Sequence, residues 1–451
     1  MAPRREEPRA QGGMKMRTHA TLLSAALLLA LPGASWAQSQ KLAHLVPNIY
    51  GPQGLFVDSA APLPDGSTHS AHFNNAFHAT FAQFNAALAS QISALPLPAP
   101  SSGFTYEMDP TLGVFTRSTD SFGPIMAERV ETVGKGKWAA GFAVQHFSFD
   151  EIEGIDLGEL PAVFTHDGAA PGGRADVVTT STSVQASLTQ QIAFVTYGLG
   201  SRLDASLAVP FVIADLSVRS DATIQRLGTG TNTVVHYYDN GSGVQGATRS
   251  YSKSGRATGI GDLTLRVKGA VARFGEGHGV ALALDLRMPT GDEEDLLGSG
   301  AWGVRPFVAA SFQLGPVSPH VNLGYQWNGE SLLAGNVTTG VSADLADEVA
   351  YVAGADVAVG RRLTLCADLV GRYVLDASRV ENSTFVGLDT AQTKFPDIRF
   401  EEGSYNQSSL ALGFKVNPAG RLLLVFNVLL ELDNNGLRDK ATPLLALDYT
   451  F

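Results

Sequence analysis

The chain ends in Pro443-Leu444-Leu445-Ala446-Leu447-Asp448-Tyr449-Thr450-Phe451, where large apolar residues recur at every second position from Leu445 onward. The residues between them are small or polar. Successive side chains of a β-strand point to opposite faces, so this period of two predicts a strand with two unlike faces. The strand should run to the final residue, the aromatic Phe451.

A closing apolar strand that ends on an aromatic residue is typical of outer-membrane β-barrels, whose assembly machinery reads such a terminus. Phe451 is therefore the expected assembly signal. The start of the chain agrees, because Lys15 and Arg17 precede an apolar run over residues 20–31. Ser35 and Ala37 then stand at the small-residue positions that precede a signal-peptidase cut. We interpret residues 1–37 as a signal peptide.

The rest of the sequence contains no apolar stretch long enough to cross a bilayer as a helix. Closed strands are the alternative, because they too satisfy every backbone group in lipid. The mean hydropathy of +0.05 fits a barrel, in which lipid-facing and lumen-facing residues alternate. The single cysteine, Cys366, excludes an intrachain disulfide framework. The net charge of −11 argues against nucleic-acid binding.

Residues 38–110 differ from the rest and predict an N-terminal plug-like segment. One stripe of aromatic and aliphatic residues there steps by three or four positions, which predicts an amphipathic helix. The helix should begin after a cap at Ser67 or Thr68 and end before Pro96. The sequence leaves three alternatives open for this helix: a plug in the lumen, packing on the barrel surface, or disorder. The stripe that would form the plug helix consists of Phe73, Phe77, Phe81 and Phe84.

Residues 111–451 read as strands joined alternately by tight turns and long polar connections. Outer-membrane barrels sort their periplasmic turns and extracellular loops in this way. We count about thirteen clear strands, and because such barrels have even numbers we expect about fourteen, with twelve as the alternative. Leu112–Ser118 would supply the missing strand, followed by Ser121–Pro124 as a compact outer loop. The predicted fold class is an all-β transmembrane antiparallel barrel.

Polar and charged residues interrupt one face of several predicted strands. An Arg or Lys on the lipid face costs about 2–4 kcal/mol at the bilayer midplane, so these side chains should face the lumen. Both signs occur, which favours a paired network over a filter of one sign. The expected lumen-lining residues are Arg202, Asp204, Asp262, Arg266, Lys268, Asp285, Arg287, Asp368, Arg372, Asn427 and Glu431.

Several motifs resemble one family of bacterial outer-membrane proteins. Gly259–Lys268, Met288–Asp292 and Gly298–Gly300 carry the resemblance, together with Ser121–Gly136 and Phe147–Asp150. The family is labelled for a transporter of the MetA pathway of phenol degradation. It is similar in outline to the long-chain fatty-acid channels, which have fourteen strands, an N-terminal plug and a path for hydrophobic molecules.

The resemblance implies a channel in the outer membrane of a Gram-negative bacterium for passive uptake of hydrophobic or aromatic small molecules. The alternative is a structural or surface-interaction barrel that transports nothing. Expected partners are outer-membrane lipids, lipopolysaccharide, the barrel assembly machinery and an apolar small-molecule substrate. No cofactor and no nucleic acid is expected.

The remaining candidates favour structural roles. Asp292–Asp295 lacks EF-hand spacing, so a solvated outer loop is preferred over a calcium site. His69, His72 and His78 lack the spacing of a metal pair, and no metal site is predicted. An enzyme built on His146 would need a serine and an acid or amide beside it, and nothing nominates them. No catalytic residue is predicted.

Overall fold

A computed structural model describes residues 40–51, 54–60, 73, 76–99, 103, 106–109, 114–117, 121–165, 175–239, 241, 245–275 and 277–451. The predicted signal peptide and the predicted helix caps Ser67 and Thr68 lie outside these residues. No helix in the described ranges is long and apolar enough to cross a membrane.

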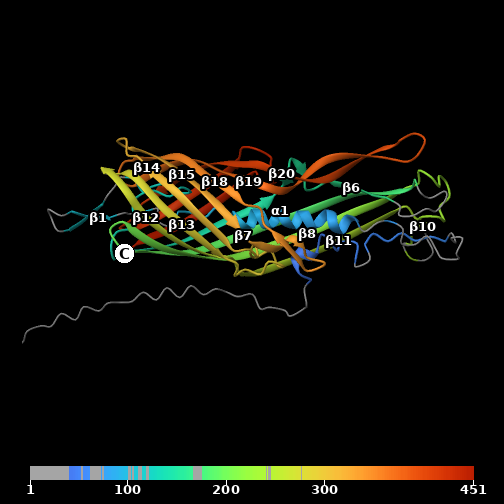
Figure 1. Cartoon of the computed structure of the whole chain (residues 1–451), viewed down its shortest axis with the longest axis horizontal. Coiled ribbons are helices and arrows are strands. Elements are labelled where there is room, and N and C mark those ends of the chain that lie inside the picture. The colour runs from blue at the N-terminus through green and yellow to red at the C-terminus, as the bar shows by residue number, and fades with distance from the viewer. Residues whose placement is uncertain are drawn as a thin grey trace, which may run out of the picture. The chain divides into compact units, whose positions relative to one another are not determined.

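The fold is an antiparallel β-barrel, as the sequence predicts (Figure 1). Its ring contains twelve strands and closes because β7 pairs with both β3 and β8. Twelve was the alternative strand count. The ring strands are β3 (Trp138–Phe149), β7 (Val177–Gly198), β8 (Leu203–Gln225), β12 (Leu263–Gly275), β13 (His278–Met288), β14 (Gly303–Ser311), β15 (Val317–Asn328), β18 (Glu348–Val359), β19 (Leu363–Val386), β20 (Lys394–Val416), β21 (Leu422–Glu431) and β23 (Ala441–Thr450).

Two further strands bring the sheet to fourteen without widening the ring. β11 (Thr248–Ile260) pairs with β8 beyond the part that β12 occupies. Ile260 of β11 lies opposite Phe211 of β8, and Thr264 of β12 lies opposite Ala208 of β8. The chain therefore advances four residues from β11 into β12 while β8 advances three, as at a β-bulge. β6 (Leu160–Thr165) likewise pairs with β7 beyond β3. Both strands lengthen the wall.

The strand predicted at Leu112–Ser118 is not part of the barrel, and that prediction is wrong. Its described part, β2 (Val114–Arg117), pairs only with β1 (Tyr106–Asp109) in a separate two-stranded sheet. A short strand with alternating residues looks the same in sequence wherever its partner lies. The ring reaches an even number of strands without it.

Short turns and long connections lie at opposite ends of the barrel (Figure 1). The short turns use glycines such as Gly360, whose φ of 70° most residues avoid. The C-terminus is at this end. The long connections fold into small sheets made of β4 (Glu151–Ile152), β5 (Ile155–Asp156) and β22 (Leu437–Arg438), β9 (Tyr238–Asp239) and β10 (Gln245–Gly246), and β16 (Glu330–Asn336) and β17 (Val341–Asp344).

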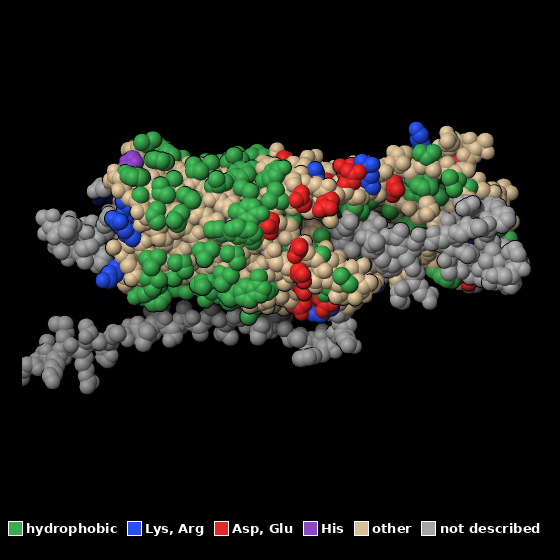
Figure 2. Space-filling model, viewed as in Figure 1, with side chains coloured by type: hydrophobic (Ala, Val, Ile, Leu, Met, Phe, Trp, Pro, Cys, Tyr) green, Lys and Arg blue, Asp and Glu red, His purple; other side chains and the backbone are tan. Residues whose placement is uncertain are grey.

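The outer face of the ring is apolar, the reverse of a water-soluble protein. In β23 the large residues Leu445, Leu447 and Tyr449 are 59%, 48% and 42% exposed, whereas Leu444 and Asp448 are buried on the inner face. Figure 2 shows a broad band of apolar side chains on the face of the barrel that is in view. Acidic side chains border the band on the side of the long connections, and basic side chains lie near the short turns. Such a band is the surface that a bilayer covers.

The N-terminal segment enters the barrel. It contains a short 3-10 helix, η1 (Leu42–His44), and the helix α1 (Ala76–Ser93). α1 packs against β16 and against the inner faces of β19 and β20, and it ends before Pro96 as predicted. The chain then descends through the lumen, where Ala99 N donates to Ile125 O at 2.9 Å. After the β1–β2 sheet it returns as residues 121–133, which we call the crossing segment.

Candidate functional site

The crossing segment spans the lumen from one wall to the other. Its backbone and side chains bond to inward-facing residues of seven different strands, β8, β12, β14, β15, β18, β19 and β20. Phe122 N donates to Thr364 on β19 at 3.0 Å, and Val133 N donates to Asp204 on β8 at 3.1 Å. Between these ends the segment bonds to Asp356 on β18, Asp368 on β19, Asn322 on β15 and Ser311 on β14. The lumen is therefore occupied by chain at the end where the short turns lie.

A buried ion cluster fixes the middle of the crossing segment. Glu128 accepts from Arg266 Nη1 at 2.6 Å and from Lys268 Nζ at 2.9 Å. Arg266 also donates two hydrogen bonds to Asp285, from Nε to Oδ1 at 2.6 Å and from Nη2 to Oδ2 at 2.7 Å. Arg305 donates to the same carboxylate at 2.6 Å. Buried charges persist only when they are paired and hydrogen-bonded, and these side chains meet that condition.

Two arginines of the barrel wall hold the C-terminal end of α1. Arg287 Nη1 donates to Ser93 O at 2.6 Å, and Arg372 Nη1 donates to Ser90 O at 2.9 Å. Arg372 is itself paired with buried Glu348 at 3.1 Å. The last carbonyls of a helix lack partners within it and carry partial negative charge, so cations there are favourable. These contacts tie α1 to the wall.

Arg372→Gln should loosen α1. The substitution removes the donors to Ser90 and leaves Glu348 buried without its ion pair, which costs about 3–5 kcal/mol. Hydrogen exchange measured by mass spectrometry should become faster in peptides that cover residues 84–93. Arg399→Gln is the matched control, because Arg399 pairs with Glu381 at an exposed position. Unchanged exchange in the Arg372 variant would contradict this role.

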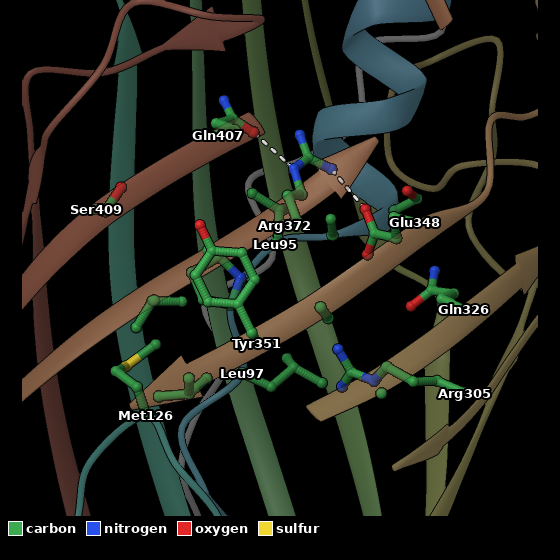
Figure 3. Close-up of a pocket in the computed structure, with 18 of the residues that line it drawn as sticks. Leu95, Leu97, Met126, Arg305, Gln326, Glu348, Tyr351, Arg372, Gln407 and Ser409 are labelled. Carbon is green, nitrogen blue, oxygen red and sulfur yellow. Dashed lines mark hydrogen bonds and ion pairs between the residues drawn. The ribbon is translucent and has the colours of Figure 1, made fainter. Parts of the chain in front are cut away.

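A cavity of about 200 Å³ remains between α1, the crossing segment and the wall. Figure 3 shows Arg305 and Gln326 on one side, Met126 on the other, and Leu97 between them. Val370 and Leu429 add apolar surface from the wall. The cavity thus combines an apolar side with a side rich in charged groups, and a concave site with convergent polar groups is the usual form of a small-molecule site.

The acidic run Asp292–Asp295 is partly solvated, with the Asp292 and Glu294 side chains 46% and 38% exposed, and it also pairs with the N-terminal segment. Lys41 Nζ donates to Asp292 and Asp295 at 2.6 Å each, and His44 bonds to Glu294 at 3.0 Å. Burial lowers the pKa of Lys41, but its hydrogen bonds to the two aspartates outweigh this, so the pKa is raised. The run thus fastens the N-terminal segment to the connection between β13 and β14. Among the described side chains, no group of three or more metal-ligand residues is placed to hold an ion.

The structure places most of the expected lumen residues on the inner face. Two differ: Arg202 is exposed in the turn after β7, because β8 begins only at Leu203. Asp262 lies at the β11–β12 bend and accepts from Ser299 N at 2.8 Å, so it holds a loop. Glu431 is half-buried, 3.6 Å from Arg438. The inward and buried residues are Asp204, Arg266, Lys268, Asp285, Arg287, Asp368, Arg372 and Asn427.

The predicted phenylalanine stripe is only partly described. Phe84 is buried in α1. Phe73 is also buried, but it precedes the helix and packs against His236. The side chains of Phe77 and Phe81 lie outside the described residues.

The sequence reasoning missed the crossing segment altogether. Ser121–Pro124, interpreted as an outer loop, is buried inside the barrel. Short polar segments with Gly and Pro look alike whether they lie in solvent or in a lumen. The sequence did contain one signal of a buried segment. The charged stretch Glu128-Arg129-Val130-Glu131 directly follows the apolar residues 125–127, which is unusual for a solvent-exposed turn.

The family described as "Putative MetA-pathway of phenol degradation" matches residues 165–419. The chain belongs to this family. The match confirms the resemblance read from the motifs, and it covers most of the barrel. No curated protein matches the sequence.

Several solved structures match this chain over most of their own length. The COG4313 outer membrane channel from Pseudomonas putida F1 is 14% identical, with 71% of this chain and 98% of that one covered and a TM-score of 0.41. The Ralstonia pickettii toluene transporter TbuX is 11% identical, with 70% and 90% covered and a TM-score of 0.33. A Pseudomonas aeruginosa FadL homologue is 10% identical, with 81% and 97% covered and a TM-score of 0.32. At these values the likeness carries no argument about substrate.

Proposed function

We propose that this protein is an outer-membrane channel of a Gram-negative bacterium for passive uptake of small hydrophobic or aromatic molecules. The observation that carries the proposal is the cavity of about 200 Å³ between the end of α1 and the crossing segment. A twelve-stranded ring is wider than the eight strands that side chains alone can fill, so an internal segment is needed to close it. The lumen then admits only what fits past that segment.

The apolar band and the family support the same function. The band is a surface for lipid and outer-membrane lipopolysaccharide (Figure 2). The family description names phenol, a small aromatic compound, which supports an aromatic substrate. No cofactor takes part in passive transport.

The test has two parts. Cell fractionation with heat-modifiable gel migration should recover the protein in the outer membrane, and recovery without detergent from the periplasm would end the proposal. Proteoliposomes containing the full mature chain should take up toluene faster than empty liposomes. A correctly inserted barrel that passes no toluene would support the alternative of a surface-interaction barrel.

Removing Phe451, or Phe451→Asp, should lower the amount of assembled barrel while export continues. Phe451 N donates to Trp138 O at 2.7 Å, so this residue completes the pairing between the last and first ring strands. An open strand edge cannot persist in lipid. Immunoblots of outer-membrane fractions should show the loss, with Phe274→Asp at the exposed end of β12 as the control. Normal outer-membrane levels of the truncated chain would refute the role of Phe451.

A further inference from the structure

Arg305 differs from the other cations of the buried ion cluster. Its side chain is 28% exposed, whereas Arg266 and Lys268 are 9% and 2% exposed. Arg305 lines the cavity, and Figure 3 shows its guanidinium directed into it. It is therefore the cation of the cluster that a molecule in the cavity can reach most readily.

Asp285 does not fully neutralise Arg305. Both oxygens of Asp285 already accept from Arg266, at 2.6 and 2.7 Å. Arg305 Nε and Nη2 share one of those oxygens, at 3.2 and 2.6 Å. Among the described residues, the third nitrogen, Nη1, has no hydrogen bond within the protein. One carboxylate thus serves two guanidinium groups.

Five arginines and four carboxylates line the cavity, and two of the arginines pair with acids outside the lining, Arg287 with Asp262 and Arg438 with Glu431. Arg287, which flanks Arg305 across the β13–β14 pair, lies 3.9 Å from Asp262 and donates its close bonds to neutral oxygens of Ser93 and Asn328. The arginines are Arg266, Arg287, Arg305, Arg372 and Arg438, and the acids are Glu128, Asp285, Glu348 and Asp439.

The other side of the cavity is apolar. Leu97 follows the end of α1, Met126 lies in the crossing segment, and Val370 lies on β19. The three side chains pack in one hydrophobic cluster. A dry cavity of about 150 Å³ is enough to hold a benzene ring. The cavity of about 200 Å³ has room for one ring and a small substituent.

We infer that this cavity selects aromatic molecules that carry a negatively charged group, with the ring against Leu97 and Met126 and the charged group on Arg305. This inference rests on the proposed channel function and names the substrate class of the same site. A guanidinium binds a carboxylate through charge-assisted hydrogen bonds, which are about twice as strong as neutral ones. Neutral rings can enter the same cavity but form no charge-assisted hydrogen bond between two ions with Arg305.

Binding to the purified full chain in detergent tests the inference, with benzoate and its neutral analogue benzamide as probes. Equilibrium dialysis should show wild-type protein binding benzoate about tenfold more tightly than benzamide. Arg305→Gln should abolish this preference, and Arg305→Lys should keep part of it. Arg399→Gln, an exposed arginine far from the cavity, should leave the preference unchanged.

Two results would overturn the inference. Equal binding of benzoate and benzamide by wild-type protein would exclude selection by charge, and this measurement needs no variant to fold. A preference that survives in a correctly folded Arg305→Gln protein would exclude Arg305. Failure of the channel function itself is seen separately, as absent toluene uptake in proteoliposomes, while the binding ratio remains measurable.

Discussion

Deleting residues 40–131 should open the barrel far more than deleting the helix region alone. The first deletion removes α1 and nearly all of the crossing segment, whereas deletion of residues 67–95 leaves the crossing segment in place. That segment stays bonded to inward-facing residues such as Thr364, Asn322 and Asp204. Because α1 and the crossing segment obstruct the lumen in series, the obstruction that remains after a deletion still limits the conductance.

Single-channel conductance in planar bilayers is the measurement. The longer deletion should raise conductance about tenfold or more, because a twelve-stranded ring without internal chain leaves a water-filled path. The shorter deletion should raise it by less than about twofold. Heat-modifiable migration of both variants serves as the control for assembly. Equal conductance of the two deletions would show that the crossing segment does not close the lumen.

The sequence was sufficient for the wall of the barrel. The alternation of apolar and small or polar side chains in a strand such as β23 can be read from neighbouring residues alone. It shows directly which side chains face the lipid and which face the lumen. The sorting of short and long connections needed nothing more. The strand count was harder, because β11 and β12 are separate runs in sequence but stack along one side of β8.

The content of the lumen could not be predicted for a different reason. The apolar residues of the crossing segment do not recur at a regular spacing, and the residues to which it bonds lie far away in sequence. Glu128 bonds to Asn322 and Lys268, which are 194 and 140 residues distant. The charges of wall residues such as Lys268 and Asp285 predicted a paired network, but only the fold shows that Glu128 of the crossing segment belongs to it.

Lys268→Met should destabilise the crossing segment more than any other single substitution proposed here. All three donors of the Lys268 ammonium are used, on Glu128 at 2.9 Å and on the carbonyls of Arg129 and Glu131 at 2.9 and 2.8 Å. The side chain is only 2% exposed, so water cannot replace these bonds. Breaking a buried ion pair by removing one partner costs about 3–5 kcal/mol.

The loss should appear as new protease cleavage within residues 121–133 and as a rise in channel conductance, while the barrel itself remains heat-modifiable. Lys135→Met is the matched control, because Lys135 is exposed in the turn that follows the segment. Adding Glu128→Gln to Lys268→Met should recover part of the stability, since no carboxylate is then left without Lys268. Additive losses in the double variant would mean that the two residues act independently. In that case the crossing segment would be held by its backbone bonds to the wall.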